Sequence, residues 1–291
     1  MNKLTIAIIT SALLLSACGG NQQINFGSDG VSGYICDSNG IACVSGNSHN
    51  SNNSNNSNQQ KNQANSAKNY VEEISGQVII ETGTVAKRNT QAIKTISNQL
   101  NTVIFNHNSA TYTITKPAKE DENFATTDMF LSSPLDDDAS LFGKNLSYSR
   151  YGIAQLTHQD DFNQKVVFSQ GYLTSVENMP TSGIINYKGA AAMWKYNQDA
   201  YLPFIGKAEL TADFDAKKVR GNISNLTSEF QNKTADDIKL EGNISANKVA
   251  GSSTEGTRLD AAFYGPNAAE LSGSFVNDGE DFKGSFGAKK Q

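Results

Sequence analysis

The sequence has little of what marks a nucleic-acid-binding or a helical protein. Its 24 Lys and Arg residues are outnumbered by 29 Asp and Glu residues, which gives a formal net charge of -5, and it contains no long basic run. Because phosphate backbones are bound by clustered Lys and Arg, nucleic acid is not an expected partner. Proline is also scarce, with 5 residues against 24 glycines. This composition, together with many Thr, Ser and Asn, is typical of a turn-rich all-β protein.

Catalytic motifs are missing from the sequence as well. No glycine spacing matches a phosphate-binding loop, no serine lies in a nucleophile elbow, and no cysteine is paired with a histidine. The sequence therefore predicts a protein without enzymatic activity.

Histidine is rare, and two of the 3 histidines are candidate haem ligands, because a single histidine can hold haem iron. His107 falls in a predicted hairpin turn and His158 ends a predicted strand. An exposed loop histidine is the simpler interpretation of each. No resident cofactor or metal is predicted, so haem enters only as a ligand that the protein binds.

The apolar run near the N-terminus, Leu4 to Leu15, falls short of the about 20 residues that a membrane-spanning helix needs. With Lys3 before it and Leu15-Ser16-Ala17-Cys18 after it, the run resembles a bacterial lipoprotein signal peptide. Residues 1–17 are then removed and Cys18 carries the acyl chains, palmitate among them, which hold the chain at a membrane. The residue after Cys18 is Gly19 and not aspartate. In this the sequence resembles lipoproteins that are sorted to the outer membrane.

Residues 18–68 are a low-complexity Asn/Ser-rich segment that is predicted to be disordered, because it has almost nothing to bury. A tether of about 50 residues reaches about 40 Å on average. Within it, Cys36 and Cys43 flank the turn signal Asn39-Gly40, and an exported chain favours a disulfide between them. A local staple is the simpler interpretation of this loop, and a docking finger is the alternative.

Residues 69–178 contain β-branched and aromatic runs that predict strands, among them 78–80, 102–105, 110–114, 146–152 and 166–171. The spacing of Ala92, Ile93, Ile96 and Leu100 predicts a short helix over 90–100. Residues 116–138 are polar and acidic, and they are predicted to form an exposed loop.

Residues 179–291 contain about eight strand-like runs, the number that closes a small barrel around its own side chains. They lie near 183–193, 205–214, 217–224, 237–245, 247–251, 258–264, 269–276 and 282–288. The second run alternates clearly, with Ala208, Leu210, Ala212 and Phe214 predicted to face inward. The small and apolar inward residues predict a filled interior and not a roomy ligand cavity.

Two blocks of the sequence resemble a known family. The run from Phe263 to Phe275, with 286–290 after it, is similar to the last strands of the C-terminal barrel of transferrin-binding protein B. It is also similar to haemoglobin-haptoglobin utilisation lipoproteins, hemophilins and factor H binding protein. The block 179–189 looks like the opening of the same barrel. The resemblance implies an all-β chain, with a β-rich handle domain over 69–178 and an eight-stranded antiparallel barrel over 179–291.

The resemblance also implies a function. It suggests a monomeric, surface-exposed outer-membrane lipoprotein that binds a host iron or haem carrier as co-receptor for a TonB-dependent transporter. Transferrin-binding protein B has two handle-barrel lobes, so a single lobe favours haemoglobin or haem over transferrin. The alternatives are binding of a complement regulator, as in factor H binding protein, and a structural or adhesive lipoprotein without a captured ligand.

The segment 194–204 is predicted to link the first two barrel strands and is unusually aromatic for a hairpin. Because Trp and Tyr dominate binding hot spots, Trp194, Tyr196 and Tyr201 are candidate contacts for the partner. The alternative, that Trp194 and Phe204 plug one end of the barrel, has equal weight.

Overall fold

The computed structural model describes residues 34–36, 43–45, 69–84, 87–116, 129–132, 140–158, 161–197, 200–228 and 232–291. Contacts divide the chain into two units, Met1–Ala64 and Asn65–Gln291, and each is considered by itself. In the first unit, β1 (Tyr34–Cys36) and β2 (Cys43–Ser45) form an antiparallel hairpin. Its register places Cys36 directly opposite Cys43.

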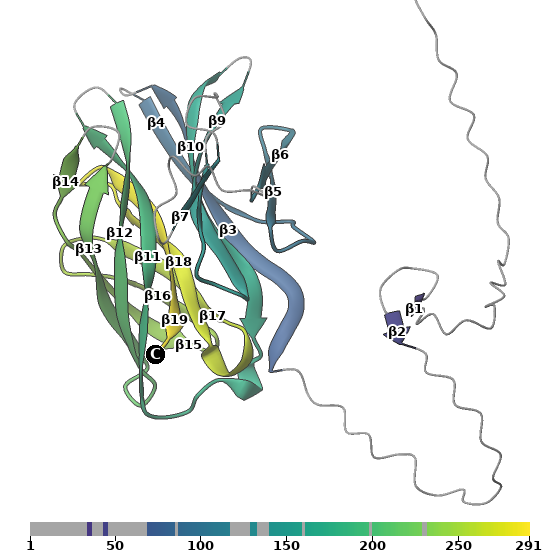
Figure 1. Ribbon diagram of the computed structural model, residues 1–291. Coiled ribbons are helices and arrows are strands. Elements are labelled where there is room, and N and C mark those ends of the chain that lie inside the picture. Colours follow the sequence, from purple (N-terminus) through teal and green to yellow (C-terminus); the bar gives the residue numbers. More distant parts are fainter. Residues whose placement is uncertain are drawn as a thin grey trace, which may run out of the picture. The chain divides into compact units, whose positions relative to one another are not determined.

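In the second unit, the first part of the chain forms an antiparallel sheet, which we call the handle sheet (Figure 1). Its strands, in spatial order, are β4 (Lys87–Lys94), β3 (Tyr70–Thr84), β10 (Asp161–Thr174), β9 (Ser149–His158), β8 (Ser140–Gly143) and β7 (Met129–Ser132). The central strand β10 contains the run Val166-Val167-Phe168, all three fully buried. A run that is buried on consecutive residues requires cover on both faces of the sheet.

One cover is the hairpin of β5 (Thr102–His107) and β6 (Ala110–Thr115). Val103, Phe105 and Ile114 of this hairpin pack with alternate residues of the handle sheet, including Val78, Ile80, Phe142, Val166 and Phe168. The two-residue turn places Asn108 and Ser109 at positive φ, 47° and 64°, as the favoured hairpin turns require.

The second cover is a closed barrel, which confirms the predicted fold. In the described residues 184–290, eight antiparallel strands pair in sequence, and β11 closes the ring by pairing with β19 (Figure 1). They are β11 (Ile184–Asn197), β12 (Ala200–Asp213), β13 (Lys218–Ser228), β15 (Ile238–Ser245), β16 (Lys248–Ser252), β17 (Arg258–Tyr264), β18 (Glu270–Asn277) and β19 (Phe282–Lys290). The short β14 (Lys233–Ala235) pairs with β13. The 3-10 turns η1 (Val176–Asn178) and η2 (Pro266–Ala268) are the described helical segments.

The barrel interior is filled by a single apolar cluster. The predicted inward residues of β12 belong to it, and Ala208, Leu210, Ala212 and Phe214 are at most 4% exposed. Glycine makes room for the larger rings: a Cβ added at Gly284 would lie 2.3 Å from Cζ of Phe275, its partner on β18. The predicted filled interior therefore agrees with the packing.

Three local predictions are wrong. Residues 90–100 do not form a helix, because residues 87–94 form strand β4, and every residue of β4 pairs with β3. The segment 116–138 is not all loop, since β7 pairs with β8 within it. The segment 194–204 is not a long link, because β11 and β12 continue as paired strands to Asn197 and Ala200. Within the described residues, no helix is long and apolar enough to span a membrane.

Candidate binding site

The second unit has two distinct ends, which the strand registers define. Tyr70, the first residue of β3, pairs with Thr174 of β10, and Leu173 of β10 pairs with Tyr264 of the barrel. The linker η1 therefore lies at this end, which we call the tether end. At the opposite end β9 meets β10, β11 meets β12, and β18 meets β19, and we call it the loop end. Any segment N-terminal to Tyr70 leaves the unit at the tether end.

Trp194 lies neither on the surface nor inside the barrel. Its side chain points outward from β11, is 6% exposed, and packs with Ile79, Ile153 and Val167 of the handle sheet. The indole Nε1 donates a hydrogen bond to the carbonyl oxygen of Val166, at 3.2 Å. Both interpretations of Trp194 are thus wrong: it is a contact between the handle sheet and the barrel. Phe204, in contrast, belongs to the barrel interior as predicted.

Tyr196 and Tyr201 face each other directly across β11 and β12, with ring centroids 5.3 Å apart. Both side chains are half-buried, and the ring of Tyr201 packs beside the cluster that contains Trp194. The Lys283 ammonium lies 5.2 Å from the same ring. The pair is placed near the loop end, and its exposed part remains a candidate contact.

Charged side chains are buried where the handle sheet meets the barrel. The Lys283 ammonium of β19 makes an ion pair with the Glu81 carboxylate of β3, and the two side chains are 4% and 8% exposed. Thr90 donates a further hydrogen bond to Glu81, at 3.3 Å. Lys165, which pairs with Glu81 in the strand register, is also buried and donates to Gln155. Its ammonium lies 4.9 Å from the Trp194 ring.

The buried ammonium of Lys165 predicts a pH-dependent stability. Burial lowers the pKa of Lys165 to about 8, below its ordinary value of about 10.4. Below pH 8 the folded chain bears the cost of burying the charge, whereas between about pH 8 and 10 the unfolded chain holds a proton that the folded chain has released. The contribution of Lys165 to the free energy of unfolding therefore rises as the pH increases from about 8 to 10. We expect Lys165→Met to raise the free energy of unfolding by about 1–3 kcal/mol at pH 7.

This gain should shrink as the pH approaches 10, which urea unfolding at several pH values would measure. The matched control is Lys188→Met, because Lys188 is exposed on the outer wall of the barrel and pairs with Glu209. It should change stability by less than about 1 kcal/mol at every pH. A Lys165→Met variant that is less stable than the parent at pH 7 would show that the charge is not a net cost.

A second contact ties the handle sheet to the barrel at the tether end. The Glu270 carboxylate of β18 accepts hydrogen bonds from the backbone N–H groups of Ser147 and Tyr148 and from the Ser149 hydroxyl, at 2.5–3.1 Å. Burial raises the pKa of this carboxyl, and the hydrogen bonds oppose that rise. Glu270 therefore holds the segment before β9 on the barrel, together with Asn145, which donates a hydrogen bond to the carbonyl oxygen of Gly287 at 3.3 Å.

Of the two candidate haem ligands, His107 has a described side chain, and it is not in an open site. His107 is the last residue of β5, and its imidazole is 6% exposed, so the expectation of an exposed loop histidine is wrong. Its Nε2 has no hydrogen-bond partner among the described residues, and its ring lies 6.4 Å from that of Tyr112. His158 ends β9, as predicted, and its side chain lies outside the described residues. No group of three or more metal-binding side chains occurs in the described part of the chain.

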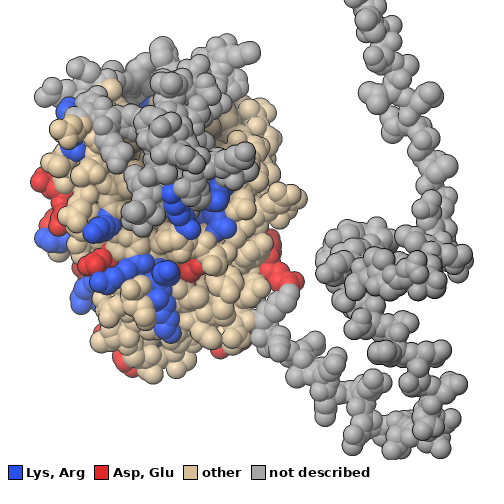
Figure 2. Space-filling view, in the orientation of Figure 1, with Lys and Arg blue, Asp and Glu red and all other residues tan. Residues whose placement is uncertain are grey.

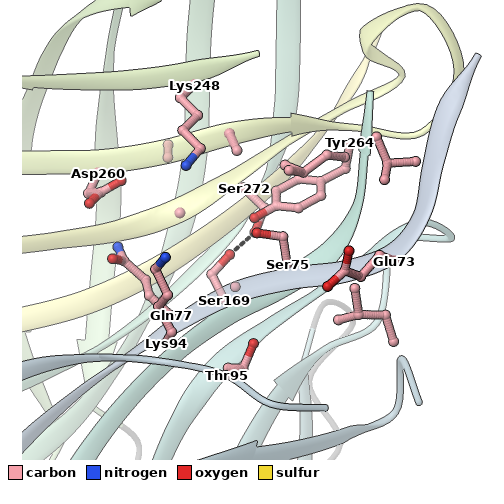
Figure 3. A pocket seen from close by; sticks show the side chains of 17 residues that line it. Glu73, Ser75, Gln77, Lys94, Thr95, Ser169, Lys248, Asp260, Tyr264 and Ser272 are labelled. Atoms are coloured by element: carbon pink, nitrogen blue, oxygen red, sulfur yellow. Dashed lines mark hydrogen bonds between the residues drawn. The ribbon is translucent and has the colours of Figure 1, made fainter. Parts of the chain in front are cut away.

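A groove lies between the handle sheet and the outer wall of the barrel. It consists of two cavities, of about 490 and 450 Å³, which share Gln77 and Asp260 as lining residues. Strands β3 and β4 form one wall, and β16, β17 and β18 form the other (Figure 3). Both Arg258 and Tyr264 line it, so it follows β17 for about 20 Å.

Polar groups line this groove. In Figure 3, Lys94 of β4 and Lys248 of β16 extend from opposite walls toward the same space. At its base the Ser169 and Ser272 hydroxyls are 3.0 Å apart, and Ser272 also donates to the carbonyl oxygen of Phe286. Burial raises the pKa of Asp260, while a hydrogen bond with Gln77 and the charge of Lys248 oppose that rise. The groove can therefore offer both donors and acceptors to a ligand.

A smaller cavity of about 200 Å³ opens at the loop end of the barrel. Its rim includes the carboxylates of Asp236, Asp237, Glu255 and Glu280. Lys239 pairs with Glu255, so this rim is only partly neutralised by the described residues. Figure 2 shows Lys and Arg interspersed with Asp and Glu over the described part of one face. Exposed pairs such as Lys188–Glu209 and Arg220–Glu241 account for part of this mixing.

Sequence reasoning did not find the groove. Lys94 comes from β4, whereas Lys248 and Asp260 come from the consecutive strands β16 and β17 near the other end of the chain, and no local motif joins the three. The β4 segment forms one wall of the groove, but the spacing of its residues predicts a helix. Cys18 lies outside the described residues, and the side chains of Cys36 and Cys43 are not described.

Comparison with known proteins identifies the barrel. Residues 179–290 match the family model of the C-lobe and N-lobe beta barrels of Tf-binding protein B. Transferrin-binding protein B of Haemophilus influenzae is 26% identical over 167 residues, which cover 47% of this chain and 27% of that protein. The protein of the same name from Moraxella catarrhalis is 29% identical over 133 residues, covering 35% and 19%. The chain thus spans less than a third of the length of these two curated relatives.

Solved structures share the fold. A mutant of transferrin-binding protein B from Haemophilus parasuis has a TM-score of 0.54 at 17% identity, covering 75% of this chain and 45% of that chain. Intact Ap-TbpB, with N and C lobes, has a TM-score of 0.52 at 18% identity, covering 75% and 46%. The family is one of binding proteins, as the sequence predicted. Residues 179–290 therefore form a barrel that matches the family model of transferrin-binding protein B barrels.

Proposed function

We propose that this chain is a surface-exposed outer-membrane lipoprotein that binds a host iron or haem carrier and acts as co-receptor for a TonB-dependent transporter. The observation that carries the proposal is the family of the barrel, supported by relatives that are named for binding transferrin. Attachment through lipid on Cys18, with a disulfide between Cys36 and Cys43, is part of the proposal. The opposed register of the two cysteines supports the disulfide, since paired Cα atoms of a hairpin lie about 4.5–5.5 Å apart.

The proposed partner site is the loop end. The hairpin connections of β9–β10, β11–β12 and β18–β19 lie at this end, opposite the end where β3 begins. The carboxylate rim and the Tyr196–Tyr201 pair lie at this end. Loops carried by a rigid scaffold are a common place for partner recognition.

Haemoglobin is the favoured carrier. The chain covers 46% of a structure that contains two lobes, and the described strands form one handle sheet and one barrel. A protein carrier is favoured over free haem because the imidazole of His107 is buried. Haem binding through His107 would require the β5–β6 hairpin to open.

The test is retention of candidate partners by the immobilised full-length protein. Haemoglobin, transferrin, haem and factor H are offered separately, and we expect haemoglobin to be retained. Asp237→Arg and Glu280→Arg at the loop end should weaken retention about tenfold if they lie in the interface. Glu177→Arg, an exposed change in η1 at the tether end, is the matched control and should leave it unchanged.

Retention of factor H without any iron or haem carrier would replace the proposal with binding of a complement regulator. Retention of none of the four would contradict both. A Soret shift on addition of haem that is lost in His107→Ala would restore direct haem binding.

A further inference from the structure

The outer strand of the handle sheet has an open edge. β4 pairs with β3 without a bulge from Lys87 to Lys94, and no other strand of the described residues pairs with it. In an antiparallel strand, alternate residues direct their N–H and C=O groups to opposite sides. The run 89–94 therefore presents a row of backbone donors and acceptors along the sheet edge. Natural proteins cover or disrupt such an edge, because it is a template for another strand.

The groove gives a strand added at this edge a surface to pack on. Thr90, Ala92 and Lys94 share the barrel-facing side of β4, since they pair with Glu81, Ile79 and Gln77. Opposite them on the barrel lie Lys248 and Ala250 of β16. A strand that continued the handle sheet beyond β4 would direct every second side chain against this wall. The small side chains of Ala92 and Ala250 leave room for apolar groups there.

Charge specifies what kind of strand fits. The Lys94 and Lys248 ammonium groups reach into the same space from the two walls (Figure 3). The charge of Lys248 also acts on the Asp260 carboxyl in the same groove, where it opposes the rise of the Asp260 pKa. The sequence of β4 contains Lys87, Arg88 and Lys94 and no acidic residue. Pairing β4 with β4 of a second copy would oppose cations to cations, which is unfavourable. An acidic strand would instead gain charge complementarity.

We propose that the edge of β4 and the groove beneath it form a strand-addition site for an extended acidic segment of a partner protein. An acidic side chain lies between Lys94 and Lys248, and the neighbouring inward side chain, two residues away, packs over Ala92 and Ala250. Backbone hydrogen bonds to β4 supply affinity, and the groove selects the side chains. This site extends along the groove from the loop end, where Asp278 lines it, and does not depend on which host carrier the protein binds.

The test uses the full-length protein and a fluorescent peptide, as long as the 8 residues of β4, that repeats Glu-Thr-Val-Thr, so that glutamate and valine lie two residues apart on one face of the strand. Fluorescence anisotropy should show binding that weakens as salt is added. Two comparison peptides separate the causes. One replaces glutamate with lysine, and the other replaces two valines with proline, which removes the N–H groups that a strand needs. Neither should bind.

Variants locate the site. Lys94→Glu and Lys248→Glu should each weaken binding of the glutamate–valine peptide about tenfold, because an attraction becomes a repulsion. Lys207→Glu, at an exposed position of β12 on the outer wall, is the matched control and should stay within about twofold. All three lysines are exposed, so their variants should retain the parent thermal unfolding temperature. Hydrogen exchange of amides 89–94 should slow when the peptide is bound.

Several results would overturn the proposal. The first is that the glutamate–valine peptide does not bind. The second is that the proline peptide binds as tightly as the glutamate–valine peptide. The third is that Lys94→Glu and Lys248→Glu bind the peptide as tightly as the parent protein does. Full protection of amides 89–94 without peptide would mean that another segment of the chain already covers the edge. A dimer that protects the same amides would assign the edge to a second copy.

Discussion

Replacing Glu81 with alanine is expected to lower the free energy of unfolding by about 3–5 kcal/mol, measured by urea unfolding of the full-length protein at pH 7. The change removes the carboxylate that pairs with Lys283 in the contact between the handle sheet and the barrel. It leaves the Lys283 ammonium, 3% exposed, without its counter-charge, and Lys165 is buried beside it in the strand register. An unpaired buried charge costs far more than the pair itself contributes.

The double variant Glu81→Met with Lys283→Met is the decisive comparison. Because it removes both charges and keeps apolar volume, it should recover most of the stability that Glu81→Ala loses. The exposed pair Lys188–Glu209 is the control, since its side chains are 58% and 54% exposed. Glu209→Ala should cost less than about 1 kcal/mol. If Glu81→Ala costs no more than Glu209→Ala, the buried pair does not hold the two parts of the fold together.

The barrel was predictable because its strands follow a simple rule. Each strand has one face in the filled interior and one face outward. The alternation along 207–214, and glycines beside aromatics, therefore predicted both the strand and the side chains that point inward. The eight predicted runs match the eight strands of the described barrel, apart from the longer β11, β12 and β13. The aromatic segment 194–204 predicted a link between the first two barrel strands. In the structure, Pro203 pairs with Trp194 within the ladder.

The handle was harder to predict because its strands are covered differently on each face. In β10 the consecutive buried residues Val166, Val167 and Phe168 give no alternation, and the sequence does not say which element covers which face. In β4 the exposed edge relaxes the pattern: Ala92 and Lys94 are exposed, and Ile93 is half-buried. Their spacing with Ile96 imitated a helical period, although Ile96 is 56% exposed. Pairing with β3 overrode this local signal.

The candidate sites depend on contacts between distant residues, which local patterns do not report. Trp194 was chosen because an aromatic hairpin is typical of a binding surface, but the handle sheet covers it. The groove residues Lys94 and Lys248 are brought together only by the placement of the handle sheet on the barrel. For Trp194 and for the groove lysines alike, the sequence predicts strands. Whether these side chains are buried or exposed depends on how the handle sheet packs on the barrel.

Trp194→Ala is expected to lower the free energy of unfolding by about 3–5 kcal/mol. The change empties the space that the indole fills between Ile79, Ile153 and Val167, and it removes the hydrogen bond from the indole to the carbonyl oxygen of Val166. Trp194→Phe keeps most of the volume and removes only the Nε1 donor. It should therefore cost about 0.5–1.5 kcal/mol, the net contribution of one hydrogen bond, because Val166 also pairs within the sheet on both sides. Urea unfolding of the two variants separates the packing contribution from that of the hydrogen bond.

Partner binding distinguishes this structural role from the binding role that the sequence suggested. A hot-spot tryptophan contributes 2 kcal/mol or more to affinity, which is about thirtyfold in the dissociation constant. Because Trp194 is covered by the handle sheet, Trp194→Phe should bind any carrier that the parent retains within about twofold. Tyr196→Phe and Tyr201→Phe, in the half-buried pair that remains a candidate contact, are the comparison, and they should weaken binding if that pair lies in the interface. Loss of binding in Trp194→Phe, with its stability close to that of the parent, would return Trp194 to the interface.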